Sequence, residues 1–461
     1  MEHRTVLFPL GDKPPKADLY YGRDVRESLR ALPENCIHTV VTSPPYWALR
    51  DYKTEPVIWG ADPECQHEWV SAGKSHQRNR QGQGGSTLRP GKDAEAWAQG
   101  AACLNPQVGA FCQKCGAWAG QLGLEPTPEL YVEHMVEVFR EVRRVLRPDG
   151  TLWLNLGDSY YAGGSTTAQS QDSRNYQEKS TLASGYTEGA CERPVKPRGH
   201  DTLKPKDLVG IPWRVALALQ QDGWWLRNCI IWKKANCMPS SIQDRMSSTY
   251  ECIFLLSRSA RYFFDLDAIR VPHTYGAYAE DGSFTPAQQW FEEEEGHRKM
   301  DQVDEYLGPN AGSPRRERRG LYNPGGKSPG DVWTFPTCPF PGAHFAVMPP
   351  NIPDRCLQAG SSEKGCCSKC GAPYVRVIER GTLRETWEPG CQCGAELDRC
   401  TVLDPFSGSG TTGMVALKRG RNYIGLDLNE TYLNMAVERV RGDAYTEEQG
   451  IPPEGSVLDI F

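Results

Sequence analysis

The chain of 461 residues lacks three features that mark whole classes of protein. No apolar run reaches the length of a membrane-spanning helix, and the first residues contain no hydrophobic segment typical of a signal peptide. Positive charge is not in excess either, because the formal net charge is -6 at pH 7. We therefore expect a soluble, cytoplasmic protein with no membrane partner, in which any contact with nucleic acid depends on local positive clusters.

Cysteine, in contrast, is plentiful, with 17 residues in the chain. Their grouping into Cys-x-x-Cys and Cys-x-Cys pairs favours metal sites over disulfides, and the ligand types and spacing suit tetrahedral structural zinc. The first predicted site comprises Cys65, His67, Cys112 and Cys115, and the second comprises Cys367, Cys370, Cys391 and Cys393. Cys103 and Cys366 are alternative ligands, and redox pairs or spare cysteines are the alternative interpretation.

Alternating strand and helix patterns predict an α/β fold. The expected elements are a strand and helix within 19–30, a strand over 37–41, a helix from 128, a strand over 152–156, a helix over 208–219, strands over 225–233 and 251–257, a strand over 401–403, a helix over 413–419, a strand over 422–426 and a helix from 429 to 440. We predict a Rossmann-like, mostly parallel sheet flanked by helices, with two zinc-ribbon insertions.

Segments of different composition interrupt this pattern. The predicted division is a core built from 1–53, 121–272, 331–360 and 401–461, with zinc ribbons over 54–120 and 361–400 and a charged insertion over 273–330. The insertion contains an acidic run at 292–295 and a basic run at 315–319. Such runs indicate either a solvated face or an arm that orders on phosphate.

A stiff loop, Thr42-Ser43-Pro44-Pro45-Tyr46-Trp47, follows the predicted strand 37–41. Two prolines prevent the chain from continuing as a hydrogen-bonded strand or as a helix. In α/β proteins, ligands bind at the carboxyl ends of the strands, where this loop is expected. The Ser43 hydroxyl and the Pro44 carbonyl can accept hydrogen bonds from an amine while Tyr46 stacks on a flat ring. The alternative is a proline-rich turn with an aromatic plug, and Trp47 is either a pocket wall or core.

The segment from Asp404 to Thr412 is a glycine-rich turn between a strand and a helix. No lysine follows its second glycine, which disfavours a phosphate loop, and its Gly-x-Gly-x-x-Gly pattern is imperfect, which disfavours a dinucleotide. Asp427 ends the next strand, where an acid can bind a ribose diol. These features favour a nucleoside without phosphate.

Together the two segments resemble the motifs of DNA amino-methyltransferases, which transfer a methyl group from S-adenosylmethionine to an exocyclic base nitrogen. The catalytic motif precedes the cofactor motif, as in the permuted beta group. The resemblance implies catalytic roles for Ser43, Pro44, Pro45 and Tyr46. It implies a cofactor site made by Asp24, Asp404, Pro405, Phe406, Gly408, Ser409, Gly410, Thr411, Thr412, Asp427 and His344. A helix N-cap would equally account for Asp24.

The resemblance also implies a bacterial or phage-encoded modification enzyme whose partner is double-stranded DNA with the target base flipped out. Target-reading residues are then expected in 273–330 and in the first ribbon insertion. In this family, Asp at the position of Ser43 is typical of adenine N6 enzymes, whereas Ser is more typical of cytosine N4 enzymes. We therefore predict methylation of cytosine N4. The alternatives are adenine N6 and, more distantly, a zinc-ribbon nucleic-acid-binding protein with an inactive core.

Overall fold

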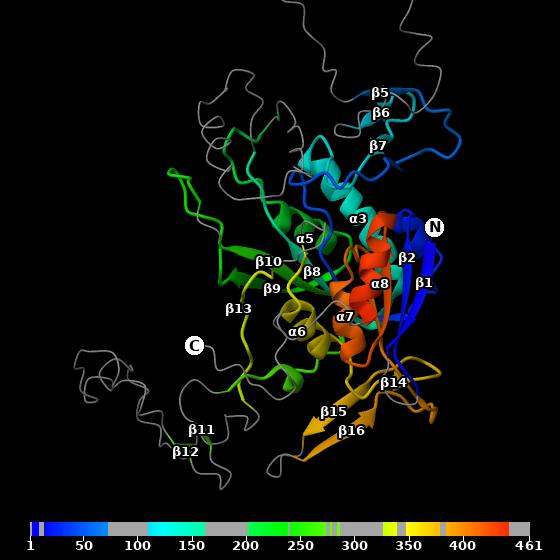
Figure 1. Ribbon diagram of the computed structural model, residues 1–461, viewed down its shortest axis with the longest axis vertical. Coiled ribbons are helices and arrows are strands. Elements are labelled where there is room, and N and C mark those ends of the chain that lie inside the picture. The colour runs from blue at the N-terminus through cyan, green and yellow to red at the C-terminus, as the bar shows by residue number, and fades with distance from the viewer. Residues whose placement is uncertain are drawn as a thin grey trace, which may run out of the picture.

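The structure is a computed structural model that describes residues 2–8, 13–71, 109–161, 200, 202–237, 240–272, 277–278, 284–285, 326–338, 347–378 and 384–441. A nine-stranded sheet runs through the described chain in the order β1-β2-β19-β18-β3-β8-β10-β9-β13 (Figure 1). Its strands are β1 (Glu2–Leu7), β2 (Lys16–Tyr21), β3 (Ile37–Thr42), β8 (Leu146–Leu156), β9 (Trp225–Lys234), β10 (Tyr250–Ser257), β13 (Val332–Phe335), β18 (Thr401–Asp404) and β19 (Asn422–Asp427). Five of the eight neighbouring pairs are parallel, and three are antiparallel.

Helices cover both faces of the sheet. One face packs on α1 (Val25–Arg30), α3 (Pro128–Val145) and α5 (Ile211–Gln221), and the other packs on α6 (Asn351–Gly360), α7 (Thr411–Lys418) and α8 (Leu433–Arg441). The 3-10 turns are Asp267–Ile269 and Glu430–Tyr432. In β3 all six residues are buried, with Val40 in one core and Val41 in the other. Burial on both faces explains why the neighbouring residues Val40 and Val41 are both apolar although their side chains point to opposite faces.

The expected α/β architecture with helices on both faces is confirmed, and the sheet is a mixed one. The strand predicted over 152–156 differs in extent, because β8 begins at Leu146 directly after α3. The segment 147–150, which precedes the predicted strand, is accommodated by a register shift opposite β3, which pairs Ile37 with Leu146 and Thr39 with Thr151. A bulge of this kind tolerates Pro148 inside a strand. The edge strand β1, antiparallel to β2, was not predicted from the sequence.

The two cysteine-rich segments form small sheets outside the core. The first consists of β4 (Val57–Trp59), β5 (Trp69–Ser71), β6 (Ala110–Cys112) and β7 (Trp118–Gly120). The second contains β14 (Cys366–Cys367) with β17 (Leu397–Asp398) and β15 (Tyr374–Ile378) with β16 (Glu385–Pro389). Figure 1 shows them at opposite ends of the molecule, with β5–β7 at the top and β14–β16 at the bottom.

The charged insertion predicted over 273–330 lies mostly outside the described residues. Its described parts are two short strands, β11 (Ala277–Tyr278) and β12 (Phe284–Thr285), and the stretch from 326. Among the described residues, no helix combines the length and apolar character needed to span a membrane.

Candidate active site

The predicted catalytic loop and the glycine-rich turn leave the sheet side by side. β3 and β18 are parallel neighbours, so both segments emerge at the same edge although they lie some 360 positions apart in sequence. The Thr42 hydroxyl donates to Asp404 Oδ1 at 2.6 Å, which joins the last residues of the two strands. Both residues are buried. This contact fixes the position of one loop relative to the other.

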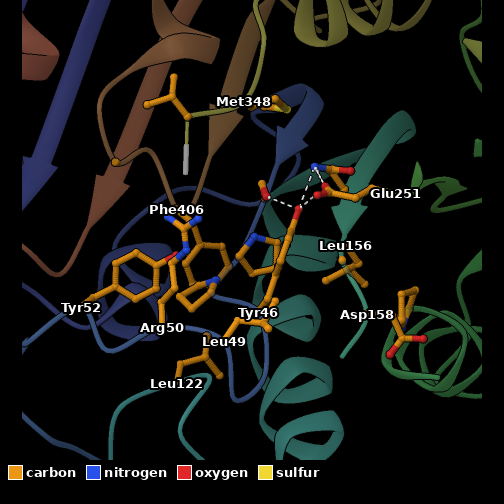
Figure 2. A pocket seen from close by; sticks show the side chains of 18 of the residues that line it. Tyr46, Leu49, Arg50, Tyr52, Leu122, Leu156, Asp158, Glu251, Met348 and Phe406 are labelled. Carbon is orange, nitrogen blue, oxygen red and sulfur yellow. Dashed lines mark hydrogen bonds between the residues drawn. The ribbon is translucent and has the colours of Figure 1, made fainter. Parts of the chain in front are cut away.

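A single cavity of about 850 Å³ extends over both segments (Figure 2). The predicted site residues that line it are Asp24, Ser43, Pro44, Pro45, Tyr46, Asp404, Pro405, Phe406, Gly408, Ser409, Thr411, Thr412 and Asp427. Gly410 is not part of this lining. His344 lies outside the described residues, although the neighbouring Met348 lines the cavity. The cavity has the size of a site for a drug-sized ligand.

The Tyr46 hydroxyl, in the predicted catalytic loop, is the centre of a polar network (Figure 2). It donates to Glu251 Oε2 at 2.8 Å and accepts from the Ser43 hydroxyl at 3.1 Å and from Asn155 Nδ2 at 2.8 Å. Asn155 Nδ2 also lies 3.1 Å from Glu251 Oε2, and Lys234 Nζ donates to Glu251 Oε1 at 2.6 Å. Burial, and then the Glu251 charge, raise the pKa of Tyr46 well above its ordinary value. The phenol is therefore neutral at physiological pH.

Close packing holds the Tyr46 ring and the prolines. A Cβ on Gly157 would come within 2.6 Å of Tyr46 Cε2, so only glycine leaves room for the ring here. The Tyr131 hydroxyl of α3 donates to the Pro45 carbonyl at 2.9 Å. Trp47 is 2% exposed and donates its ring N–H to the Glu125 carbonyl, so it belongs to the core and not to the pocket wall.

Side chains of two strands, β2 and β19, hold the glycine-rich turn through hydrogen bonds. The hydroxyls of Tyr21 and Tyr423 both donate to Ser407 Oγ, at 2.9 and 2.8 Å. Gly410 has φ +77 and precedes α7, and a Cβ there would lie 3.2 Å from Ala436 Cβ. Gly410 thus contributes to the shape of the turn without lining the cavity, because only glycine combines this backbone angle with this packing at low cost.

Two carboxyl groups, of buried Asp404 and half-buried Asp427, line the cavity at the glycine-rich turn. Asp427 accepts the backbone N–H of Gly408 and of Asn429, each at 2.8 Å, and Asp404 accepts the N–H of Phe406 at 3.1 Å. Burial raises the pKa of each carboxyl group to about 6, against an ordinary value of 3.8. At neutral pH both are predominantly ionised, and they place negative charge next to the cavity.

Two further acids at strand ends are engaged in helix caps. Asp24 accepts the N–H of Arg26 at 2.8 Å and also forms an ion pair with the Arg26 side chain at 2.6 Å. The N-cap interpretation of Asp24 is therefore correct, and Asp24 lines the cavity as well. Asp158 accepts the N–H groups of Gly210 and Ile211 at 3.0 and 3.1 Å, at the start of α5.

Sequence reasoning missed Glu251, Lys234 and Asn155 as site residues. The signal available for Glu251 was a charged residue at the start of the otherwise apolar strand Cys252–Leu256. No local pattern linked it to Tyr46, which lies 205 positions earlier.

The predicted metal ligands converge in two groups whose ligand atoms all lie within 4.8 Å of one another. In the first, Cys65 Sγ lies 3.8 Å from Cys112 Sγ, and Cys115 Sγ lies 3.4 Å from His67 Nδ1. Two thiolates on one tetrahedral zinc are separated by about 3.8 Å. The second group contains Cys367, Cys370, Cys391 and Cys393.

The alternative ligand Cys366 lies in a third, buried group with His38 and Cys400. The His38 ring has no lone pair for a metal, because Nδ1 accepts the Thr401 N–H at 2.9 Å and Nε2 donates to the Gly371 carbonyl at 2.9 Å. This group therefore does not have the chemistry of a metal site.

Comparison with known proteins gives extended matches. A family model described as DNA methylase matches residues 37–438. The Type II methyltransferase M.SmaI of Serratia marcescens is 32% identical over 417 residues, which cover 90% of this chain and 88% of that protein. M.XycI of Xanthomonas campestris pv. cyanopsidis is 30% identical over 419 residues, covering 91% of this chain and 86% of that protein. Among solved structures, the cytosine-N4-specific PvuII DNA methyltransferase aligns over 94% of this chain and 89% of its own, with 14% identity and a TM-score of 0.43.

The family match covers most of the chain, and M.SmaI is similar along nearly its whole length. The resemblance inferred from the two motifs is thereby confirmed. The chain belongs to the N6/N4 family of DNA methylases, which are S-adenosylmethionine-dependent DNA methyltransferases.

Proposed function

We propose that the protein transfers a methyl group to the exocyclic N4 of a cytosine flipped out of double-stranded DNA. The observation that carries this proposal is the joining of the catalytic loop and the glycine-rich turn through the contact of Thr42 with Asp404, on one shared cavity. The side chain at the catalytic position, Ser43, is a neutral hydroxyl, which favours cytosine N4 over adenine N6. Like its relatives, the enzyme would act as a Type II modification methyltransferase.

The cavity lining fits S-adenosylmethionine. When bound, this cofactor supplies an electrophilic methyl group on a positively charged sulfur. The carboxylates of Asp404 and Asp427 are suited to attract that positive charge and to accept hydrogen bonds from a ribose diol. Phe406 and Tyr432 line the same space and offer flat surfaces for an adenine ring. No lysine or arginine occurs between Asp404 and Thr412, in keeping with a ligand that carries no phosphate.

On the catalytic side, the enzyme must activate a poor nucleophile, because the lone pair of an aromatic amine is delocalised into its ring. Ser43 Oγ and the Pro44 carbonyl are proposed to accept its two hydrogens and so favour a tetrahedral nitrogen. Positioning against the methyl group would supply much of the remaining acceleration. A base inside the helical stack cannot reach these groups, so Tyr46 is proposed to stack on a base that has been flipped out.

The two cysteine groups are proposed as structural zinc sites. Four soft ligands at tetrahedral spacing suit zinc, and neither group borders the cavity directly. Bound metal would then stabilise the small sheets and take no part in methyl transfer.

The test is incubation of unmethylated DNA with isotopically labelled cofactor, followed by mass spectrometry of the nucleosides. Labelled N4-methylcytosine is expected, and N6-methyladenine as the only product would overturn the choice of base. No label in any DNA, with cofactor binding retained, would favour the inactive binding protein. Ser43→Ala should slow the single-turnover rate by about 100-fold while leaving the urea unfolding midpoint in place.

A further inference from the structure

The polar network around Tyr46 contains more than a stacking ring requires. Its members come from four separate segments: the catalytic loop, β8, the end of β9 and the start of β10. It ends on Glu251, whose side chain is 15% exposed and is paired with Lys234. Stacking on a base needs only the aromatic ring of Tyr46, so it does not explain the hydroxyl or the ion pair of Glu251 with Lys234.

The hydrogen-bond directions in this network are fixed by chemistry. An ionised carboxylate only accepts, so the single hydrogen of the Tyr46 hydroxyl points to Glu251. The Tyr46 oxygen must then act as acceptor, and the Ser43 hydrogen points to it. As a result, Ser43 Oγ has its own hydrogen committed and presents lone pairs to any incoming N–H donor.

We propose that Glu251, acting through Tyr46 and Ser43, receives the proton that the base amine loses during methyl transfer. This inference rests on the proposed function, in which Ser43 accepts an N–H of the target amine. The nitrogen lone pair forms the new N–C bond as the C–S bond breaks, and the electron pair of that bond stays on sulfur. The electrons of one N–H bond return to nitrogen, and its proton passes to Ser43 Oγ.

The remaining steps conserve protons along the network. Ser43 gives its own proton to Tyr46 Oη, and Tyr46 gives its own to Glu251, which becomes a neutral carboxylic acid. The positive charge lost from sulfur balances the negative charge lost from the carboxylate. Because the phenol is held neutral by burial and by Glu251, Tyr46 passes a proton on only as it receives one. Lys234, 24% exposed, holds a positive charge 2.6 Å from the acid and so favours release of the proton afterwards.

Asn155 and Lys234 fit this arrangement as positioning residues. Asn155 Nδ2 contacts both Tyr46 Oη and Glu251 Oε2, which keeps the two oxygens at their 2.8 Å separation. Lys234 holds the other carboxylate oxygen at 2.6 Å, so Oε2 is left to face the phenol. The close packing of the Tyr46 ring on Gly157 also restricts the position of the hydroxyl.

Tyr46→Phe is the sharpest probe, because it keeps the stacking ring and removes only the hydroxyl. Glu251→Gln keeps the shape of the side chain at the far end of the network and removes the proton acceptor. The matched control is Tyr374→Phe in β15, a residue outside the cavity lining. The duplex carries the site that the wild-type enzyme is found to methylate. Single-turnover rates are measured, together with the Kd of cofactor by calorimetry and of DNA by fluorescence anisotropy.

Tyr46→Phe and Glu251→Gln should each lower the single-turnover rate by about 100-fold or more, the usual contribution of a positioned proton acceptor. Both Kd values should stay within about twofold, and the double variant should be no slower than the slower single variant. Wild-type rates in Tyr46→Phe, or losses that multiply in the double variant, would overturn the relay alone. A wild-type enzyme that methylates no DNA would overturn the proposed function and this inference with it.

Discussion

Replacing Asp404 by asparagine should stabilise the cofactor-free protein at neutral pH. The carboxyl group is buried, and its pKa is about 6 in the folded protein against an ordinary 3.8. Asparagine keeps the acceptor that Thr42 and Phe406 use, since both donate to the same oxygen, Oδ1. The substitution therefore removes a buried charge while preserving these two hydrogen bonds.

The magnitude follows from the pKa difference. Each pH unit of pKa difference corresponds to about 1.4 kcal/mol, so ionised Asp404 costs the folded state about 3 kcal/mol at pH 8. The folded protein binds the proton more tightly than the unfolded chain, so this cost is absent below pH 3.8 and grows as the pH rises through 6. At pH 5 roughly half of it is present.

Urea unfolding of the cofactor-free protein at pH 8 and pH 5 tests this reasoning. Asp404→Asn should raise the free energy of unfolding by about 2–3 kcal/mol at pH 8 and by about half as much at pH 5. Exposed Asp331→Asn serves as the control and should change neither value. A gain that is absent, or that is larger at pH 5, would refute the inference that Asp404 is ionised in the folded protein at a cost in stability.

The same substitution should weaken cofactor binding if the charge of Asp404 attracts the sulfonium. The Kd of S-adenosylmethionine is expected to rise by about tenfold or more. S-adenosylhomocysteine has an uncharged sulfur and should lose less affinity. Equal losses for the two ligands would mean that Asp404 acts on the shape of the turn and not through its charge.

Three further outcomes are expected. Chelation should release two zinc ions per chain in a colorimetric assay and lower the thermal midpoint, and release of none would contradict both metal sites. Gly410→Ala should lower the free energy of unfolding in urea by about 1–3 kcal/mol, because the new Cβ combines a left-handed backbone with crowding against Ala436. Gly60 is also left-handed but has open space around it, so Gly60→Ala measures the backbone contribution alone. Trp47→Ala should cost about 3–5 kcal/mol by the same measurement, whereas half-exposed Trp225→Ala should cost far less.

The parts of the fold that could be predicted from sequence are those encoded locally. The Thr127-Pro128 start of α3, and the buried run that forms β3, depend on neighbouring residues alone, and both elements were identified. The two motifs could be placed on one sheet edge because parallel strands end there together. Strand β8 was predicted too short, since its first residue, Leu146, pairs with Ile37, which lies more than a hundred positions earlier.

The unpredicted part of the site depends on register between distant strands. Glu251 reaches Tyr46 because β10 pairs with β8 so that Cys252 lies opposite Leu156, next to Asn155. A shift of one residue would turn Glu251 to the other face of the sheet. Periodicity identifies a strand but does not specify its partner's register, so Glu251 could be recognised as unusual but not as part of the polar network around Tyr46.

The two cysteine units, meaning the small sheets that carry the two cysteine groups, contact different parts of the large sheet and its loops, so loss of the proposed metal should have different effects at each. Trp59 of the first unit lines the cavity and packs under Arg26, 3.9 Å from the ring centroid, and Arg26 holds Asp24. The second unit is tied to the opposite ends of the strands, where Arg147 donates to the Cys370 carbonyl at 2.6 Å. Disrupting the first unit should thus weaken ligand binding through Asp24, whereas disrupting the second should lower the stability of the sheet and leave the cavity intact.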